Sequence, residues 1–169
     1  MHALLTRPSI RRWVVGPIVR GLTGLPLAVA AVPMALFGGA GRIGRVQSRL
    51  ARRFGGGPPS TPRRPGAVRV LAHSALVVVP AAVAFAAVLM LLFVAYSGYL
   101  YPLRPDTIAA AGHPFTPDRQ VLPGAWGGPT LAGAWFVHSC VAFGIQVLCA
   151  VVARGLIGVQ GRATRWLLG

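Results

Sequence analysis

Acidic residues are nearly absent from this sequence of 169 residues. It has two aspartates and no glutamate, against 17 basic residues that are all arginine, for a formal net charge of +15. Carboxylate metal cages, acid–base dyads and paired-carboxylate hydrolysis all need more carboxylates than this. The composition therefore predicts a protein that is not an enzyme, has no catalytic residues, and binds no cofactor or metal.

Charge of either sign and cysteine are also scarce. Charged residues make up 11% of the chain, whereas a soluble domain carries about a quarter. The two cysteines, Cys140 and Cys149, lie in one apolar run at a spacing that fits neither a redox CxxC pair nor a zinc site. We expect both to be small buried hydrophobic residues, and the low charge disfavours an ordinary cytosolic enzyme.

Two long apolar runs are present instead, at 70–100 and 131–153, and neither contains a formal charge. A helix needs about 20 apolar residues to cross the hydrocarbon core of a bilayer. Both runs meet this length, and Pro80 near one end is tolerated where neighbouring groups satisfy the freed carbonyl. The sequence therefore predicts an all-α integral membrane protein with two transmembrane helices.

A third apolar stretch, at 13–40, is interrupted by Arg20 and by several prolines and glycines. Arginine at the bilayer centre costs about 2.5 to 3.5 kcal/mol, so a span here is expected to begin after Arg20. A re-entrant hairpin with both ends cytoplasmic is the alternative, and it keeps the N-terminal arginines inside. A cleaved twin-arginine signal is disfavoured, because the eight arginines between 42 and 69 would resist translocation.

Two basic segments are predicted to be amphipathic helices on the membrane surface. In 41–54 the apolar residues recur at helical spacing and the arginines take the opposite face, and 156–167 repeats this pattern. Such helices lie in the interface and bind anionic lipid. The residues expected to contact the membrane surface or a partner are Arg45, Arg49, Arg52, Arg53, Arg162 and Arg165.

The two basic segments are also related in sequence. When 40–56 is laid over 153–169, six of seventeen positions coincide, with a shared V-Q-x-R-x-x-R core. This indicates an internal repeat in which a membrane segment is followed by a basic helix.

The distribution of arginines predicts the topology, because cytoplasmic flanks collect them. We expect a membrane segment with a basic helix at 1–57 and a cytoplasmic Pro/Gly/Arg linker at 58–68. A two-span unit follows at 69–169, with an outer loop at 101–130 and a C-terminal basic helix. The protein is therefore expected in the cytoplasmic (inner) membrane as a multi-pass protein with a cytoplasmic C-terminus.

Several short motifs in the second half are similar to one membrane family. They are AHSAL at 72–76, SGYLYPL at 97–103, WGGPT at 126–130 and RGL at 154–156, together with His138. In these motifs the chain resembles the sensor domain of actinobacterial type, a membrane-embedded input region often joined to a histidine kinase. Members of that family typically begin with a full helical hairpin, whereas the stretch before Gly41 is too short for two spans. The sequence contains no kinase motifs, so the resemblance implies signalling through a partner.

His138 is the main candidate for sensing. It shares a helical face with Ala142, Gln146 and Cys149, and an ionisable residue inside a membrane helix is a functional hypothesis by default. A structural hydrogen bond between helices is the alternative reading. We expect the hydroxyls of Tyr96 and Tyr99 to pair with this imidazole, and we expect His73 to lie among the lipid headgroups.

Together these features predict a non-catalytic sensory or regulatory membrane module that signals through a histidine kinase or another cytoplasmic protein. The alternative is a small membrane subunit of a transporter, which would show charged or unwound residues at mid-membrane. The expected partners are the bilayer with its anionic lipids and this signalling protein, and self-association stays open. Nucleic-acid binding is disfavoured, because the arginines flank apolar spans and lack interleaved aromatics.

Overall fold

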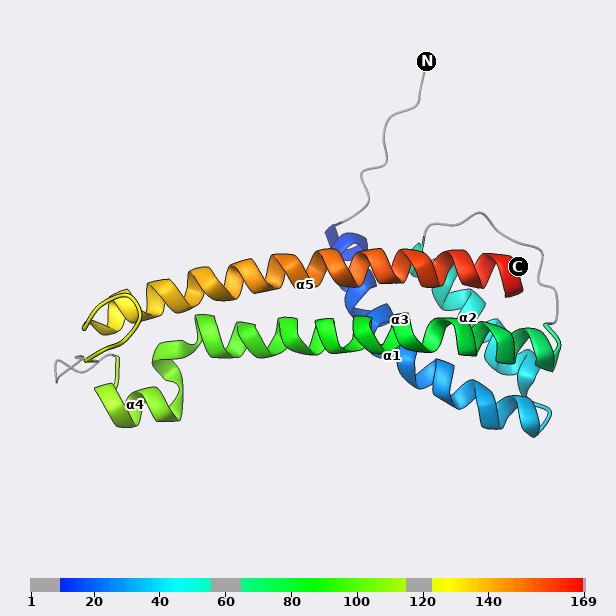
Figure 1. Cartoon of the computed structure of the whole chain (residues 1–169), viewed down its shortest axis with the longest axis horizontal. Helices are drawn as coiled ribbons and strands as arrows, with labels where there is room; N and C mark the ends of the chain where they lie inside the picture. Colours follow the sequence, from blue (N-terminus) through cyan, green and yellow to red (C-terminus); the bar gives the residue numbers. More distant parts are fainter. Residues whose placement is uncertain (1–9, 56–64, 115–122, 169) are drawn as a thin grey trace, which may run out of the picture. The chain divides into compact units, whose positions relative to one another are not determined.

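The computed structural model describes residues 10–55, 65–114 and 123–168, and the elements within these ranges are helices. The all-α prediction is confirmed. In chain order (Figure 1) the elements are α1 (Ile10–Leu36), α2 (Ala40–Gly55), α3 (Ala67–Val94), the π-helical turn η1 (Ala95–Tyr99), the 3₁₀ turn η2 (Tyr101–Leu103), α4 (Pro105–Ala111) and α5 (Leu131–Leu168). Most of the expected linker at 58–68, and both Asp118 and Arg119 in the expected outer loop, lie outside the described residues.

Three helical segments are long and apolar enough to cross a membrane: Val15–Leu36, Ala67–Tyr99 and Leu131–Leu168. The second and third contain the two apolar runs seen in the sequence, which form helices as predicted. They are 33 and 38 residues long, whereas about 20 residues suffice to cross the hydrocarbon core. Each therefore has more than ten residues to spare.

The first apolar stretch forms one continuous helix, α1, and contains no hairpin. The chain reverses only at Phe37–Gly39, where Gly38 has a φ of 76°, a conformation that glycine adopts without steric cost. Helix α1 extends back past Arg20 to Ile10, and its stretch that is long and apolar enough to cross a membrane begins at Val15. Arg20 itself is buried within the protein.

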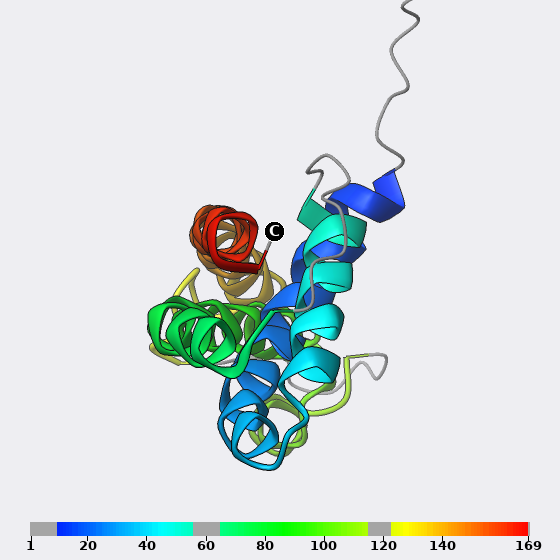
Figure 2. The same ribbon diagram turned by 90° about the vertical axis from the view of Figure 1, so that its right-hand side faces the viewer.

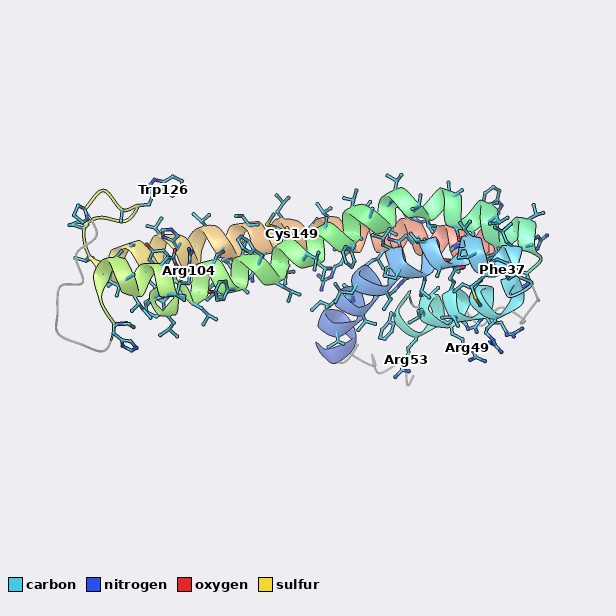
Figure 3. The ribbon with its side chains drawn as sticks, turned by 90° about the horizontal axis from the view of Figure 1, so that it is seen from below. Phe37, Arg49, Arg53, Arg104, Trp126 and Cys149 are labelled. Atoms are coloured by element: carbon cyan, nitrogen blue, oxygen red, sulfur yellow. The ribbon has the colours of Figure 1, made fainter. Side chains whose placement is uncertain are left out.

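The amphipathic helix predicted at 41–54 is present as α2, and its apolar face packs on α1. The Gln47 side-chain amide donates a hydrogen bond to the Leu27 carbonyl at 3.3 Å, and the Phe54 ring contacts α1 at Gly16. Helix α2 therefore runs back along α1 in the opposite direction. Figure 3 shows Arg49 and Arg53 projecting away from the ribbon, on the exposed face of α2.

Two compact units divide the chain, and α3 and α5 contribute to both. The first unit consists of α1, α2, the part of α3 up to Val88 and the part of α5 from Val152. In the end-on view of Figure 2, α1 lies between α2 and α3. The core of this unit draws on all four helices and is formed by Ala31, Ala35, Ala40, Ile43, Val70 and Leu168. Its small residues allow helix backbones to approach closely.

The basic C-terminal segment is the last part of α5 rather than a separate helix. On the apolar face predicted for the membrane surface, Val159 and Trp166 are exposed at 48% and 78%, whereas Ala163 is buried. Gln160, Thr164 and Leu168 of this segment are buried as well. Polar contacts, described below, allow the polar members of this group to be buried.

The second unit spans Leu89–Val151 and contains the end of α3, the two short turns, α4 and the first half of α5. Helix α5 begins after Thr130, whose hydroxyl oxygen accepts a hydrogen bond from the Gly133 N–H at 3.1 Å. Such a contact satisfies one of the free N–H groups of the first helical turn. This unit contains all three residues that the sequence singled out for sensing, namely Tyr96, Tyr99 and His138.

Candidate functional site

A π-helical turn, η1 at Ala95–Tyr99, continues α3 in the second unit. Such turns are rare, and they often occur at functional sites because they interrupt the regular i→i+4 hydrogen bonding of the helix. Two side chains of α5 donate hydrogen bonds to backbone carbonyls, one before η1 and one at its last residue. The Gln146 amide donates to the Leu91 carbonyl at 3.2 Å, and the Trp135 indole N–H donates to the Tyr99 carbonyl at 3.0 Å.

The side chain of Tyr99 joins these two contacts. Its hydroxyl donates to Oε1 of Gln146 at 2.8 Å. One amide side chain therefore binds a backbone carbonyl before the π turn and a hydroxyl at its end. Because Gln146 is fixed on α5, a shift in the register of η1 would break at least one of these hydrogen bonds.

Gly98, at the centre of the turn, sets the distance between η1 and α5. A methyl group built at Gly98 would lie 2.2 Å from Cβ of Ala142 and 3.0 Å from the His138 carbonyl oxygen. Atoms do not approach as closely as 2.2 Å without displacement. The absence of a side chain at Gly98 is therefore what allows the two helices to pack here.

His138 lies beside Tyr101 and is not paired with Tyr96 or Tyr99. The two rings stack with centroids 4.0 Å apart and planes inclined by 21°. Nδ1 of His138 lies 2.7 Å from the Ala134 carbonyl oxygen, and since a carbonyl can only accept, this nitrogen is the donor. Nε2 of the neutral imidazole is then left to accept a hydrogen bond.

The predicted pairing with Tyr96 and Tyr99 is therefore wrong, because the chain turns sharply after η1 and brings Tyr101 to the imidazole instead. Tyr96 is half exposed, and Tyr99 bonds Gln146. We call the assembled group, namely Tyr99, Tyr101, Trp135, His138 and Gln146, the tyrosine–histidine cluster.

Arg104 extends the cluster toward α4. Its guanidinium lies over the Tyr101 ring, 5.7 Å from the centroid, and forms an ion pair with Asp106. The hydrogen bond from Arg104 holds the pKa of the Asp106 carboxyl below its usual range.

Two cavities adjoin the cluster. One has a volume of about 120 Å³ and is lined by His138, Ser97 and Arg104 among others. The second has a volume of about 290 Å³ and is lined mainly by apolar groups, including Tyr99, Leu131 and Trp135. The volume of the larger cavity is close to the lower limit of about 300 Å³ for pockets that bind small molecules. Residues of η1 line both cavities, so a ligand in either one would contact the π turn.

The predicted surface arginines are distributed over two helices. On α2, Arg45, Arg49 and Arg53 are exposed and Arg52 is half buried, whereas Arg162 and Arg165 are exposed on α5. The sequence did not identify Gln146 as a partner of Tyr99, or Tyr101 as the partner of His138. The one feature of the sequence that points to these contacts is the helical stripe of His138, Ala142 and Gln146. All three side chains are at least partly buried.

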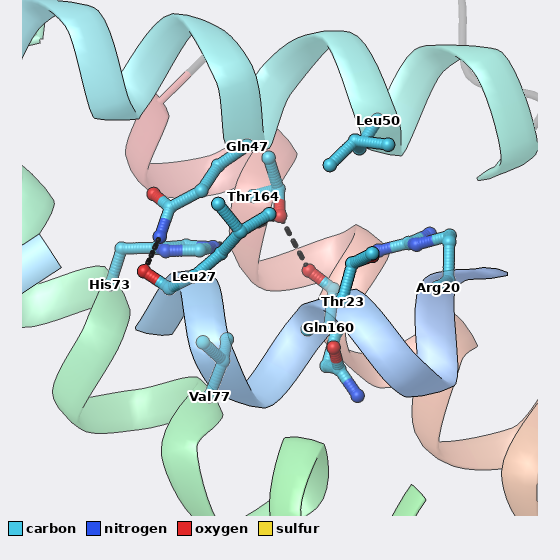
Figure 4. A pocket seen from close by; sticks show the side chains of 10 residues that line it. Arg20, Thr23, Leu27, Gln47, Leu50, His73, Val77, Gln160 and Thr164 are labelled. Atoms are coloured by element: carbon cyan, nitrogen blue, oxygen red, sulfur yellow. Dashed lines mark hydrogen bonds between the residues drawn. The ribbon is translucent and has the colours of Figure 1, made fainter. Parts of the chain in front are cut away.

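His73 is not placed as predicted. It is 3% exposed, and its Nε2 lies 3.0 Å from the Thr164 hydroxyl of α5. We expected it among lipid headgroups because it lies near the start of α3. Instead it belongs to a polar pocket inside the first unit, which also includes the buried side chain of Arg20 (Figure 4).

The described residues contain no group of three or more histidine, cysteine or acidic side chains that could hold a metal ion. The cysteines do not fit the expectation of burial, since Cys140 is exposed on the protein surface and Cys149 is half buried. Comparison with models of protein families, with curated proteins and with solved structures gives no match for this chain.

Proposed function

We propose that this chain is a non-catalytic sensory or regulatory module of a cytoplasmic membrane. The observation that carries the proposal is the π turn η1, which side chains of α5 hold in one register between two cavities. A turn of this kind has a regular α-helical alternative, so it can serve as a two-state element. A ligand that contacts η1 in one register only would shift the balance between the two states.

The signal would leave the site along α5. This helix runs without interruption from Leu131 to Leu168, and it carries both Gln146, which contacts η1, and the exposed Arg162. A change in the contacts of Gln146 therefore acts on the same helix that presents the C-terminal arginines. We place the partner, a histidine kinase or another cytoplasmic protein, at these arginines. The resemblance of the motifs at 72–76, 97–103 and 126–130 to the sensor family supports the same assignment.

The packing of α2 on α1 supports a specific membrane placement. If α1 crossed the hydrocarbon core, α2 would enter the core with it and would expose Arg42, Arg45, Arg49 and Arg53 to lipid. At about 2.5 to 3.5 kcal/mol each, these four residues would cost roughly 10 kcal/mol or more. We therefore place the α1–α2 pair in the cytoplasmic interface, with α3 and α5 as the membrane-crossing helices and the C-terminus in the cytoplasm.

The transporter alternative draws on one observation, the charged Arg20 within an apolar helix. The other feature expected of a transporter, an unwound first segment, is not found, since α1 is continuous through residues 10–36. The sensory proposal explains more of the described contacts.

A label at Cys140 tests for two states. Cys140 is exposed on α5 in the second unit, so a trifluoromethyl group attached there, in a Cys149→Ser background, would report on the helix next to η1. The full chain in nanodiscs should give two fluorine resonances. Tyr99→Phe should change their ratio about threefold to tenfold, as expected for the loss of one hydrogen bond.

Tyr96→Phe is the matched control, because it removes the same atom from a half-exposed tyrosine and should leave the ratio unchanged. The rate of tryptic cleavage at Arg162 should change in Tyr99→Phe and not in Tyr96→Phe if α5 transmits the shift. The proposal would be contradicted if the spectrum showed a single resonance that Tyr99→Phe does not alter, and if the parent, Tyr99→Phe and Tyr96→Phe were cleaved at equal rates.

A further inference from the structure

The interior of the first unit contains a guanidinium group for which the described residues provide no counter-ion. Arg20 is 7% exposed, and its buried Nη1 has no hydrogen-bond partner among the described residues. Of the two acidic residues, Asp106 belongs to the second unit and Asp118 lies outside the described residues. Arginine stays protonated in proteins, and an unpaired buried charge is strongly unfavourable.

A second guanidinium approaches the same point. A methyl group built at Gly161 on α5 would lie 3.6 Å from Nη1 of Arg20 and 3.7 Å from Nη1 of Arg165. Two positive charges held beside one glycine repel each other. A negative group placed between them would reverse this repulsion.

Polar atoms converge beside Arg20 in a cavity of about 30 Å³ (Figure 4). The Thr164 hydroxyl donates to the Gln160 carbonyl at 2.8 Å, so its oxygen accepts from Nε2 of His73. The amide of Gln47 donates to the Leu27 carbonyl. Among the described residues, Nη1 of Arg20 and Nε2 of Gln160 then remain as buried donors without a partner, and Oε1 of Gln47 and Nδ1 of His73 remain as buried atoms without one.

The internal repeat explains part of this arrangement. Gln47 on α2 and Gln160 on α5 occupy equivalent positions of the V-Q-x-R-x-x-R core, and both line the cavity. Both side chains are buried, although glutamine is mostly exposed in soluble proteins. The repeat therefore places two glutamine side chains at one buried site beside Arg20.

We infer that this pocket binds an anionic phosphate oxygen, which accepts hydrogen bonds from Nη1 of Arg20 and Nε2 of Gln160 and faces Arg165. The volume admits one oxygen or a water-sized group, so the rest of the phosphate stays outside. The phosphate comes from an anionic lipid headgroup or from free phosphate. A lipid fits better, because Arg20 lies in an apolar helix and the exposed arginines of α2 attract anionic headgroups.

Thermal unfolding of the full chain in detergent tests this inference. Short-chain phosphatidylglycerol is titrated in one arm, short-chain phosphatidylcholine in a second, and inorganic phosphate at constant ionic strength in a third. Phosphatidylglycerol should raise the Tm of the parent protein, since a ligand that binds only the folded state stabilises it. In Arg20→Gln the half-saturating concentration should rise about tenfold or more.

Arg69→Gln is the control, because it removes one exposed arginine from α3 without touching the cavity. It should respond as the parent does. If inorganic phosphate alone produces the Arg20-dependent shift, the phosphate site stands and its source is the free anion. If Arg20→Gln does not fold, Gln160→Ala keeps the charge and removes one donor, and it should also weaken the response. The inference would be overturned if the ligands shifted the Tm equally in every arm for the parent, for the Arg20 or Gln160 variant, and for the control.

Discussion

Gly98 shows how much of the candidate site depends on one missing side chain. Gly98→Ala places a methyl group 2.2 Å from Cβ of Ala142, so η1 and α5 must separate or the turn must change register. Overpacking of this kind typically costs about 1 to 3 kcal/mol. We expect the free energy of unfolding to fall by that amount, measured by denaturant titration of the full chain in detergent.

Gly144→Ala provides the comparison on the same helix. A methyl group at Gly144 meets nothing within 4 Å, and alanine is favoured over glycine in a helix by about 1 kcal/mol. This variant should be as stable as the parent or more stable. If both variants lose the same stability, the close approach at Gly98 is not what positions η1.

Asp106 provides a prediction about pH. The hydrogen bond from Arg104 lowers the pKa of this carboxyl in the folded protein, so the contact stabilises the start of α4 above the unfolded pKa of about 4. That contribution is lost as the pH falls through the folded value. Hydrogen exchange of the α4 amides, corrected for the intrinsic rate, should become faster between pH 6 and pH 3.

In Asp106→Asn the exchange should be faster at pH 6 and should change little on acidification. The difference will be small, because the carboxylate is exposed and solvent screens the ion pair. Identical pH profiles for the parent and Asp106→Asn would show that the ion pair does not order α4.

At the scale of the element, α2 binds protein with one face and presents arginines on the other. Since its apolar face is packed on α1, its attraction to lipid rests mainly on charge. Anionic nanodiscs should therefore slow tryptic cleavage at Arg49 and Arg53 at low salt. The protection should disappear near 1 M salt, where the screening length falls to about 3 Å.

Zwitterionic nanodiscs should give little protection at either salt concentration. If the protection in anionic nanodiscs persists at high salt, apolar insertion holds α2 in the membrane, and its face is not occupied by α1.

The helices themselves could be predicted from the sequence, whereas the buried faces of some could not. Uncharged runs of bilayer length identify α3 and α5, and the helical spacing of Ile43, Val46 and Leu50 identifies α2. For the end of α5, the apolar spacing predicts a face for the membrane surface, but hydrophobicity alone does not predict which polar side chains are buried in the protein. Gln160 and Thr164 are buried there through a local hydrogen bond and a contact with His73, which is distant in sequence.

The candidate site was foreseen in part for a similar reason. His138 and Gln146 share a helical stripe that is visible in the sequence, but their partners depend on the turn after α3. Helical periodicity favours no particular tyrosine once the chain leaves the helix, so neither the π turn nor the stacking of Tyr101 could be predicted. For Arg20 the sequence alone indicates a cost to membrane insertion, whereas its burial beside α5 depends on tertiary packing that the sequence does not show.

At the scale of the whole molecule, the lengths of the helices fit the placement of α1 and α2 in the interface. A helix of 33 or 38 residues is about 50 Å long or more at about 1.5 Å per residue, which exceeds the hydrocarbon thickness of about 30 Å. The excess on α3 and α5 can extend through the interface, where the first unit contributes α1, α2 and their arginines. The lipid attraction predicted for the basic helices then acts on α2 and the end of α5 together.

This placement predicts which positions share one side of the membrane. In a background with Cys140 and Cys149 replaced by serine, single cysteines at positions 11, 66 and 130 are treated with an impermeant thiol reagent on intact cells. Position 130 should be labelled, whereas positions 11 and 66 should react only after the membrane is opened, because position 11 lies at the start of α1 and position 66 directly precedes the cytoplasmic end of α3. A transmembrane α1 would instead put position 11 on the same side as position 130. Labelling of positions 11 and 130 together on intact cells, with position 66 protected, would therefore show that α1 crosses the bilayer and that α2 separates from it in the membrane.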